Sequence, residues 1–157
     1  MLRRVGRLVA ILAVLAPVHA WAAENQDLPE AELWARLAAG GQVTIMRHAL
    51  APGSGDPSNF KLDDCATQRN LSDKGRLEAT DVGDNFRKHG INSARVFSSQ
   101  WCRCLETGEL LRLGPVEPLP LLNSFFATRE QGDAQTEALR RWILEQDLSR
   151  PLVLVTH

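Results

Sequence analysis

Residues 42–49 read QVTIMRHA, an apolar run that meets two ionisable side chains without a gap. Gln42–Met46 is rich in apolar and β-branched residues, and it predicts a buried β-strand. Arg47 and His48 follow the strand at once, and both side chains bind anions or take part in proton transfer. Ligands of open parallel sheets bind beyond the carboxyl ends of the strands, so this junction predicts a functional site.

Two later segments have the same character. Ala94–Ser98 (ARVFS) predicts a second short strand, and Ser99–Arg103 follows it directly. Leu152–Val155 (LVLV) is entirely apolar, which predicts a central strand buried on both faces, and His157 lies just beyond it. If the three strands are parallel, their carboxyl ends lie along one edge of the sheet. The residues expected to meet at that edge are Arg47, His48, Arg103 and His157.

Helical patterns alternate with these strands. They cover Leu28–Leu37, Lys74–His89, Trp101–Leu113 and Thr136–Leu148, the last of which offers Leu139, Trp142, Ile143 and Leu144 to the core. Residues 50–70 form a long loop rich in Pro, Gly, Ser, Asn and Asp, and loops of this length are usually functional. The alternation predicts an α/β fold of three layers, with a largely parallel sheet flanked by helices.

The composition is that of one globular domain. The chain has 157 residues, 44% of them hydrophobic and 24% charged, which excludes collagen-like, coiled-coil and wholly disordered chains. Its formal net charge is −1, so electrostatics do not favour nucleic acid as a partner. Arg3, Arg4 and Arg7 are the only charged side chains of the first 22 residues, so the remainder of the chain is acidic.

Residues 1–22 have the pattern of a secretory signal peptide. The three arginines form a positive amino-terminal region, Leu8–Val18 is an apolar run, and Ala20–Ala22 supplies a small-x-small cleavage pattern. A membrane-spanning helix needs ~20 apolar residues, so a cleaved signal is favoured over an anchor. We therefore expect residues 23–157 to be the mature domain, periplasmic or secreted, which meets the membrane only transiently during export.

The three cysteines are Cys65, Cys102 and Cys104. In the oxidising compartment that export implies, we expect one disulfide, between Cys65 and either Cys102 or Cys104, with one thiol left over. Cys102 and Cys104 lack the C-x-x-C spacing and a companion pair, so the sequence predicts no metal site.

Two arginines with two histidines make a pocket suited to a dianion. Guanidinium binds phosphate in bidentate fashion, and imidazole is a nucleophile that accepts a phosphoryl group. Phosphoryl transfer requires mainly positioning and charge neutralisation, which these side chains supply without a metal or other cofactor. The sequence has no P-loop, G-x-S-x-G or H-E-x-x-H motif, so P-loop nucleotide-binding, serine-hydrolase and zinc-protease functions lose support.

Four segments, in order, resemble the histidine phosphatase superfamily, also called the phosphoglycerate-mutase-like family. Val43–Ala49 (VTIMRHA) is similar to its strand and R-H-G signature, and Asn70–Ala79 (NLSDKGRLEA) is similar to the start of its next helix. Val96–Thr107 (VFSSQWCRCLET) resembles its S-S-x-x-x-R segment, and Leu152–His157 (LVLVTH) resembles the strand that leads to its second histidine. With the predicted signal peptide, the sequence resembles an exported bacterial member of that superfamily.

The resemblance implies roles for individual residues. His48 is the expected nucleophile, which becomes phosphohistidine. Arg47 and Arg103 are expected to bind the phosphoryl oxygens, and His157 is the expected second imidazole beside the phosphoryl group. The expected substrate-binding set is Arg47, Arg103 and Ser99, and the resemblance assigns no role to Arg69 and Asn70 at the edge of the loop.

The sequence departs from the family pattern in three places. Ala49 stands where the family has glycine, which implies an ordinary backbone conformation there. The family's proton-donating glutamate falls on Asn123, which has no carboxylic proton, so Glu130 or Asp133 in the next loop is the expected substitute. The family continues past its second histidine with a helix and a strand, so we expect this sequence, which stops at His157, to be C-terminally incomplete.

The sequence thus predicts an exported phosphomonoester phosphatase that acts through a phosphohistidine on His48 without a metal. Its expected partner is a small phosphorylated substrate. A non-catalytic protein that binds phosphate or another anion on the same scaffold is the alternative, because the proton donor is missing. A phosphomutase is a weaker alternative, because export separates the protein from the cytoplasmic pool of glycolytic phosphoesters. A redox protein built on Cys102 and Cys104 is weaker still.

Overall fold

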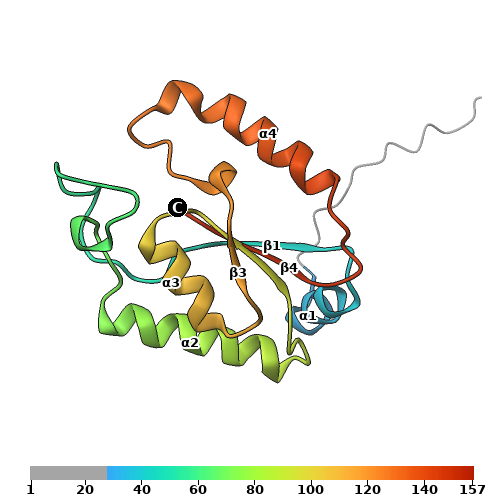
Figure 1. Cartoon of the computed structure of the whole chain (residues 1–157). Coiled ribbons are helices and arrows are strands. Elements are labelled where there is room, and N and C mark those ends of the chain that lie inside the picture. Colours follow the sequence, from blue (N-terminus) through green and yellow to red (C-terminus); the bar gives the residue numbers. More distant parts are fainter. Residues whose placement is uncertain (1–27) are drawn as a thin grey trace, which may run out of the picture.

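The computed structural model describes residues 28–157, which form a sheet between helices (Figure 1). The predicted signal peptide, residues 1–22, lies outside these described residues. Four strands build the sheet: β1 (Val43–Arg47), β2 (Arg95–Ser98), β3 (Val116–Pro118) and β4 (Leu152–Thr156). Their spatial order is β1-β4-β2-β3, and all three pairs are parallel. The predicted parallel α/β sheet is therefore confirmed.

The central strand is β4, as its uninterrupted apolar run predicts. Leu152–Val155 is fully buried, with β1 on one side and β2 on the other. The last residue of β1, Arg47, is paired with Thr156 at the end of β4, and β2 ends one residue earlier in the same register. Three polar residues therefore lie at the same end of the sheet, just past the carboxyl ends of β1, β2 and β4: His48, Ser99 and His157.

Helices cover both faces of the sheet, and the predicted three layers result (Figure 1). α2 (Asp73–Lys88) and α3 (Cys102–Leu111) lie on one face, α4 (Gly132–Leu144) lies on the other, and α1 (Glu30–Ala39) precedes β1. Among the described residues, no helix has the length and apolar character needed to cross a membrane.

Each face of the sheet packs its own apolar core. On the α2–α3 face, Phe86 of α2 and Leu111 of α3 share a buried cluster with Val153 of β4. On the other face, Trp142 of α4 packs edge-to-face on Phe97 of β2, with 4.9 Å between ring centroids. Burial of these apolar faces is the main source of stabilisation, and it fixes the strand ends that carry the polar residues.

Several helix boundaries differ from the sequence prediction. The first helix, predicted over 28–37, spans Glu30–Ala39. The last helix, predicted over 136–148, spans Gly132–Leu144, because a 3₁₀ turn leads directly into it. It ends early because Asp147 accepts hydrogen bonds from the backbone N–H and the hydroxyl of Ser149, which favours a turn. Leu144 is consequently 75% exposed, so its predicted place in the core was wrong. α3 ends at Leu111, two residues earlier than predicted.

Loop 50–70 is held against the start of α3 by a disulfide. Cys65 is bonded to Cys102, whereas Cys104 is a free, buried thiol. Gln68 adds further links, because its side chain donates to two carbonyl oxygens of the loop and accepts from the backbone N–H of Cys102. Loops generally carry function where a rigid scaffold positions them, and these links fix the residues that this loop brings to the strand ends.

The helices α2 and α3 approach each other closely at Gly83. A Cβ atom at this position would lie 2.2 Å from the carbonyl oxygen of Leu111. The backbone of α3 cannot yield to such a contact without shifting the helix, so only glycine permits this spacing. Leu111 is the last residue of α3, so this close contact fixes the carboxyl end of α3 against α2.

Candidate active site

His48 lies directly after β1 and is buried. Its Nδ1 lies 2.7 Å from the carbonyl oxygen of Ala49. Because a carbonyl oxygen only accepts, Nδ1 carries the ring proton and the lone pair is on Nε2. Burial is the main cause that lowers the pKa of His48 below 6.5; Arg103 and Arg47 lower it further, and the hydrogen bond to Ala49 opposes them. His48 is therefore a neutral imidazole with a nucleophilic nitrogen at neutral pH.

Ala49 has an ordinary backbone conformation, as expected. Among the non-glycine residues that the structure describes, Arg112 alone has a positive φ. The N–H of Ala49 donates to Oγ1 of Thr107 at 3.0 Å, and that hydroxyl donates to the carbonyl oxygen of Arg103 at 2.7 Å. This pair of bonds joins the segment that carries His48 to the helix that carries Arg103.

His157 faces His48, with 5.7 Å between the ring centroids. Its Nδ1 lies 3.3 Å from Nη2 of Arg103, which can only donate, so Nδ1 is the acceptor. Nε2 then carries the proton and donates to Oγ of Ser99 at 2.8 Å, and Ser99 donates to Oδ1 of Asn123 at 3.3 Å. Burial, followed by the charges of Arg103 and His48, lowers the pKa of His157 to about 3. His157 is neutral, with its tautomer set by its neighbours.

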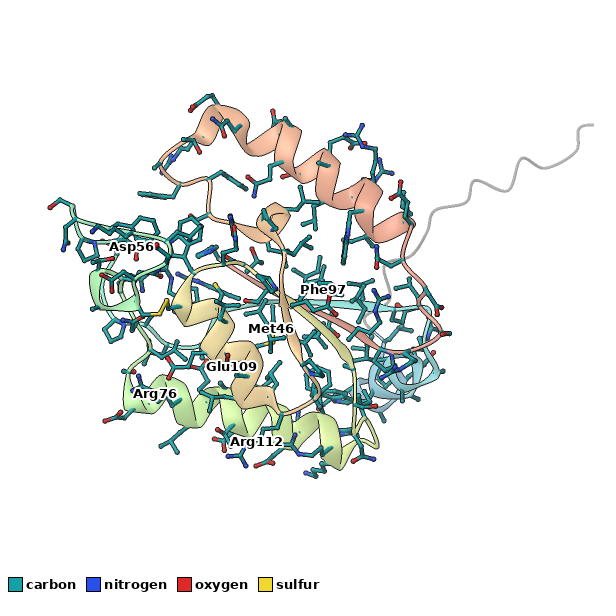
Figure 2. The ribbon with its side chains drawn as sticks, viewed as in Figure 1. Met46, Asp56, Arg76, Phe97, Glu109 and Arg112 are labelled. Carbon is teal, nitrogen blue, oxygen red and sulfur yellow. A yellow bond between two sulfur atoms is a disulfide. The ribbon has the colours of Figure 1, made fainter. Side chains whose placement is uncertain are left out.

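Arg103 lies in the first turn of α3 and is buried. Its Nη1 and Nη2 donate to the two carboxylate oxygens of Asp56, at 2.7 and 3.2 Å. Figure 2 shows Asp56 in loop 50–70, beside the start of α3. Nη1 also contacts the carbonyl oxygen of Arg69 at 3.3 Å. Nε has no hydrogen-bond partner among the residues that the structure describes. Arg103 is thus fixed in place with one unused donor.

Two further arginines line the same site. Arg69 is held by the loop, since its Nε donates to the carbonyl oxygen of Gly55 at 2.8 Å and its Nη1 donates to that of Ala51. Arg47, the last residue of β1, is exposed and forms no ion pair within residues 28–157. Arg47 is therefore the cation best placed to meet an incoming anion.

These side chains line one open cavity of about 1140 Å³, which is large for a small-molecule site. Its lining residues are of two kinds. One part is basic and holds the two imidazoles with Arg47, Arg69 and Arg103, while a fourth arginine, Arg129, lies over the ring of Phe126. The other part is aromatic: Phe60 and Trp101 stack with ring centroids 5.2 Å apart, and Phe126 is 66% exposed at the surface. The aromatic residues of the lining are Phe60, Trp101, Phe125 and Phe126.

Four of the residues predicted from the sequence line this cavity together: Arg47, His48, Arg103 and His157. Ser99 does not line it. Ser99 is fully buried and its hydroxyl contacts His157, so it positions that ring instead of meeting a ligand. Glu130 and Asp133 are exposed and also lie outside the cavity lining.

Sequence reasoning missed Asp56, the one carboxyl side chain among the described residues that line the cavity. One feature of the sequence could have indicated Asp56. It lies in a Gly-Ser-Gly-Asp-Pro turn shortly after His48, in the loop that was already expected to be functional. Sequence reasoning assigned no functional role to Trp101 either, although it lines the cavity and donates from Nε1 to Asp56 at 3.0 Å.

The remaining thiol takes no part in redox or metal chemistry at this site. Cys104 lies 3.6 Å from Nε2 of His157, and burial raises the pKa of its thiol to about 12. The thiol therefore stays protonated and unreactive at neutral pH. Cys102 is bonded to Cys65, so a Cys102–Cys104 pair does not form and the redox alternative was wrong. Within residues 28–157, no group of three or more His, Cys, Asp or Glu side chains is arranged to hold a metal ion.

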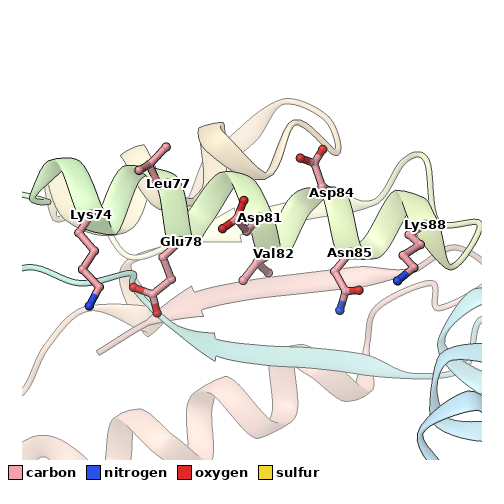
Figure 3. Close-up of a pocket in the computed structure, with 8 residues that line it drawn as sticks. All are labelled: Lys74, Leu77, Glu78, Asp81, Val82, Asp84, Asn85 and Lys88. Atoms are coloured by element: carbon pink, nitrogen blue, oxygen red, sulfur yellow. The ribbon is translucent and has the colours of Figure 1, made fainter.

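A second, more open groove runs along α2, and Figure 3 shows Glu78, Val82 and Asn85 on the side of this helix toward the strands. All eight of its lining residues come from this one helix, and they include Lys74, Glu78, Asp81 and Lys88. Three carboxylates lie between two lysines along it, and charges of both signs are typical of a solvated helix face. It includes none of the histidines or arginines of the cavity.

The protein is thus an α/β protein with an anion pocket at the carboxyl ends of its parallel strands. Two facing imidazoles and the guanidinium of Arg103 line this pocket. Comparison with solved structures identifies the fold. The chain matches a protein assigned as the phosphohistidine phosphatase SixA from Agrobacterium tumefaciens, with a TM-score of 0.54 and 21% sequence identity, over 73% of this chain and 68% of that chain. The chain therefore shares the fold of that solved structure, as the resemblance implies.

The comparisons give two further results. The chain also matches the protein histidine phosphatase SixA complexed with tungstate, with a TM-score of 0.47 and 22% identity, over 73% of this chain and 68% of that chain. No family model and no curated protein matches the sequence.

Proposed function

We propose that this protein is a histidine phosphatase, which removes a phosphoryl group through a phosphohistidine on His48. The observation that carries the proposal is the state of the two facing imidazoles: Nε2 of His48 is free and unprotonated, and His157 lies 5.7 Å away, centroid to centroid. A neutral imidazole with an available lone pair is what a nucleophile requires. The fold shared with a phosphohistidine phosphatase supports the same activity.

The reaction proceeds in two displacements. Nε2 of His48 attacks phosphorus, and the bond from phosphorus to the leaving group breaks; the leaving group departs with that electron pair and takes a proton from solvent. The hydrogen bond from Nδ1 to the carbonyl oxygen of Ala49 stabilises the positive charge that develops on the ring. Water then attacks the phosphohistidine and loses a proton, the P–N bond breaks, and inorganic phosphate leaves with His48 restored.

Cationic groups neutralise the phosphoryl oxygens. Arg47 and Arg103 carry permanent charge, and both line the cavity. His157 is neutral in the free protein, but a dianion beside it raises its pKa by direct attraction, which favours an imidazolium there. These fixed charges stabilise the transition state without a metal ion, because the charge to be neutralised sits on the equatorial oxygens.

The leaving group that this cavity favours is a flat aromatic ring. Stacking of an aromatic ring on Phe126, which is largely exposed and has Arg129 over one face, is worth ~0.5–1.5 kcal/mol. Among the described residues, no carboxylic acid is placed to protonate a poor leaving group. Burial is the largest single effect on Asp56 and raises its pKa, but the hydrogen bonds from Arg103, Arg69 and Trp101 together outweigh burial and hold this pKa below 3.8. A phenolate or the imidazole of phosphohistidine departs readily without such an acid. We therefore propose aryl phosphates or phosphohistidine as the substrate class.

Export completes the proposal. The signal-peptide pattern of residues 1–22 supports a mature protein that acts outside the cytoplasm. Cell fractionation followed by mass spectrometry tests it, with the expected amino terminus at Ala23. Recovery of full-length chain in the cytoplasm would contradict export.

The experiment that tests the activity is phosphoryl trapping. Wild-type protein quenched during turnover of ³²P-labelled phenyl phosphate should retain acid-labile, base-stable label on one peptide, the one that contains His48. His48→Ala should lose both the label and turnover, with unchanged circular dichroism. Turnover retained by His48→Ala would refute the nucleophile. Dialysis against EDTA should leave kcat unchanged.

The missing acid also favours a second candidate, a non-catalytic anion-binding protein on the same scaffold. That candidate predicts that wild-type protein binds tungstate but neither acquires label nor releases phenol. The trapping experiment therefore separates the two candidates.

A further inference from the structure

We infer that Asp56 is a positioning residue that holds one edge of the Arg103 guanidinium so that the other edge faces the phosphoryl group. The inference rests on the proposed function. A guanidinium has five N–H donors in fixed directions. Nη1 and Nη2 form its end edge, and Nε and the second N–H of Nη2 form its side edge.

The end edge of Arg103 is fully occupied by Asp56. Both carboxylate oxygens accept from it, and they also accept from the backbone N–H of Arg69 at 3.1 Å and from Nε1 of Trp101 at 3.0 Å. Four donors from three residues thus converge on a carboxylate that is 17% exposed. A carboxylate held by four donors is a fixed part of the site, and its charge offsets that of the neighbouring arginines.

The side edge of Arg103 remains open to a ligand. Nε is buried and without a partner among the described residues, and buried N–H groups in this state are rare in folded proteins. The second N–H of Nη2 makes only a long contact of 3.3 Å to Nδ1 of His157. This contact shows that the side edge faces His157, beside the nucleophile. Two parallel N–H groups on one edge match two oxygens of a phosphoryl group.

A different role for Asp56 makes the opposite prediction. A carboxylate bound in bidentate fashion to an arginine resembles a bound phosphate, so Asp56 would compete with the substrate if it occupied the same edge. The two roles differ in sign: removal of a competing anion tightens the binding of an oxyanion, whereas removal of a positioning residue weakens it. The unused side edge favours positioning, because the ligand and Asp56 then bind different edges of one guanidinium.

The test is the dissociation constant of tungstate, a tetrahedral dianion, measured by isothermal titration calorimetry at pH 7. Asp56→Asn preserves the shape of the side chain but removes its charge. We expect its Kd to rise at least tenfold, although the cavity becomes more positive. Asp63→Asn is the matched control, because Asp63 is an exposed carboxylate of the same loop, outside the cavity lining. Its Kd should equal that of the wild type.

An Asp56→Asn protein that is folded by near-UV circular dichroism and binds tungstate as tightly as the wild type, or more tightly, would overturn the inference. If Asp56→Asn does not fold, Asp56→Glu is measured instead. It keeps the charge and moves the carboxylate by one methylene, so positioning predicts weaker binding and unchanged affinity overturns it. Wild-type protein that binds tungstate without turnover would contradict the phosphatase but not the role of Asp56.

Discussion

The hydroxyl oxygen of Ser99 lies 2.8 Å from Nε2 of His157. This contact joins the residue after β2 to a residue just past β4, which neighbouring parallel strands bring to the same edge of the sheet. With Asn123 as the next acceptor, it fixes the proton of His157 on Nε2 and leaves Nδ1 toward Arg103. The second imidazole of the proposed site is therefore oriented by a buried serine that lies outside the cavity lining.

Loss of the Ser99 hydroxyl should reduce turnover more than it reduces stability. Ser99→Ala leaves the Nε2 proton of His157 without its acceptor and frees the ring to turn, so kcat should fall by about 10- to 100-fold. The stability cost of the unpaired group should be about 1–3 kcal/mol. Steady-state kinetics and urea unfolding measure the two effects.

Ser98→Ala is the matched control for Ser99. Ser98 is equally buried, but its hydroxyl donates to the carbonyl oxygen of Ser99 and contacts no residue of the cavity. Its kcat should remain within about threefold of wild type, as expected for a change that leaves the ring in place. If kcat fell equally in Ser99→Ala and Ser98→Ala, the result would contradict the positioning of His157 by Ser99.

The rate should depend steeply on the leaving group. In a series of substituted phenyl phosphates, log kcat/KM should fall as the pKa of the phenol rises, because no acid protonates the departing oxygen. The ring shape is constant across the series, so stacking on Phe126 does not vary. A slope near zero, with chemistry rate-limiting, would indicate an acid that the described residues do not supply.

A fall in pH should destabilise the protein already at pH values above those at which its carboxylates titrate. The pKa of His157 is about 3 in the folded state and 6.5 as its ordinary value, and that of His48 is also lowered. Between these values the unfolded chain binds more protons, so the free energy of unfolding falls as the pH falls from 6.5 toward 4.5. The slope should not exceed about 1.4 kcal/mol per pH unit for each histidine.

His157→Gln checks the origin of this dependence. Burial and the charges of Arg103 and His48 hold His157 neutral, while Asp56 opposes them and Arg69 reinforces them. Urea unfolding curves between pH 4.5 and 7.5 should therefore be flatter for His157→Gln than for the wild type. If the free energy of unfolding changed equally with pH in both proteins, the pH dependence would come from groups other than His157.

Gly83→Ala should strongly destabilise the fold. Its Cβ would meet the carbonyl oxygen of Leu111 at 2.2 Å, so α2 or α3 must shift. Overpacking of this kind costs about 1–3 kcal/mol or more, although alanine is otherwise the better helix former. Asp81→Ala, an exposed position on the same helix, is the control and should change stability by less than about 0.5 kcal/mol. A stable Gly83→Ala protein would show that the helices can separate.

Much of the fold could be predicted from local pattern. The apolar run Leu152–Val155 predicts a buried central strand, and in the structure it is β4, between β1 and β2. Parallel geometry then predicts that His48 and His157 share an edge, and they do. The boundary of α4 could not be predicted in this way, because side-chain bonds at Asp147 ended the helix where its apolar periodicity continued.

What the sequence alone determined is three of the four strands, the four helices and the residues just past the three predicted strands, because periodicity and strand-end position are local properties. The short strand β3 was not predicted. Tertiary structure decided the contacts across long separations. Asp56 binds Arg103, which is 47 residues away in the sequence. Cys65 forms its disulfide with Cys102 and not with Cys104. Ser99 is buried beside His157. Each depends on the path of a loop or the packing of a helix in space, which no periodic pattern in the chain specifies.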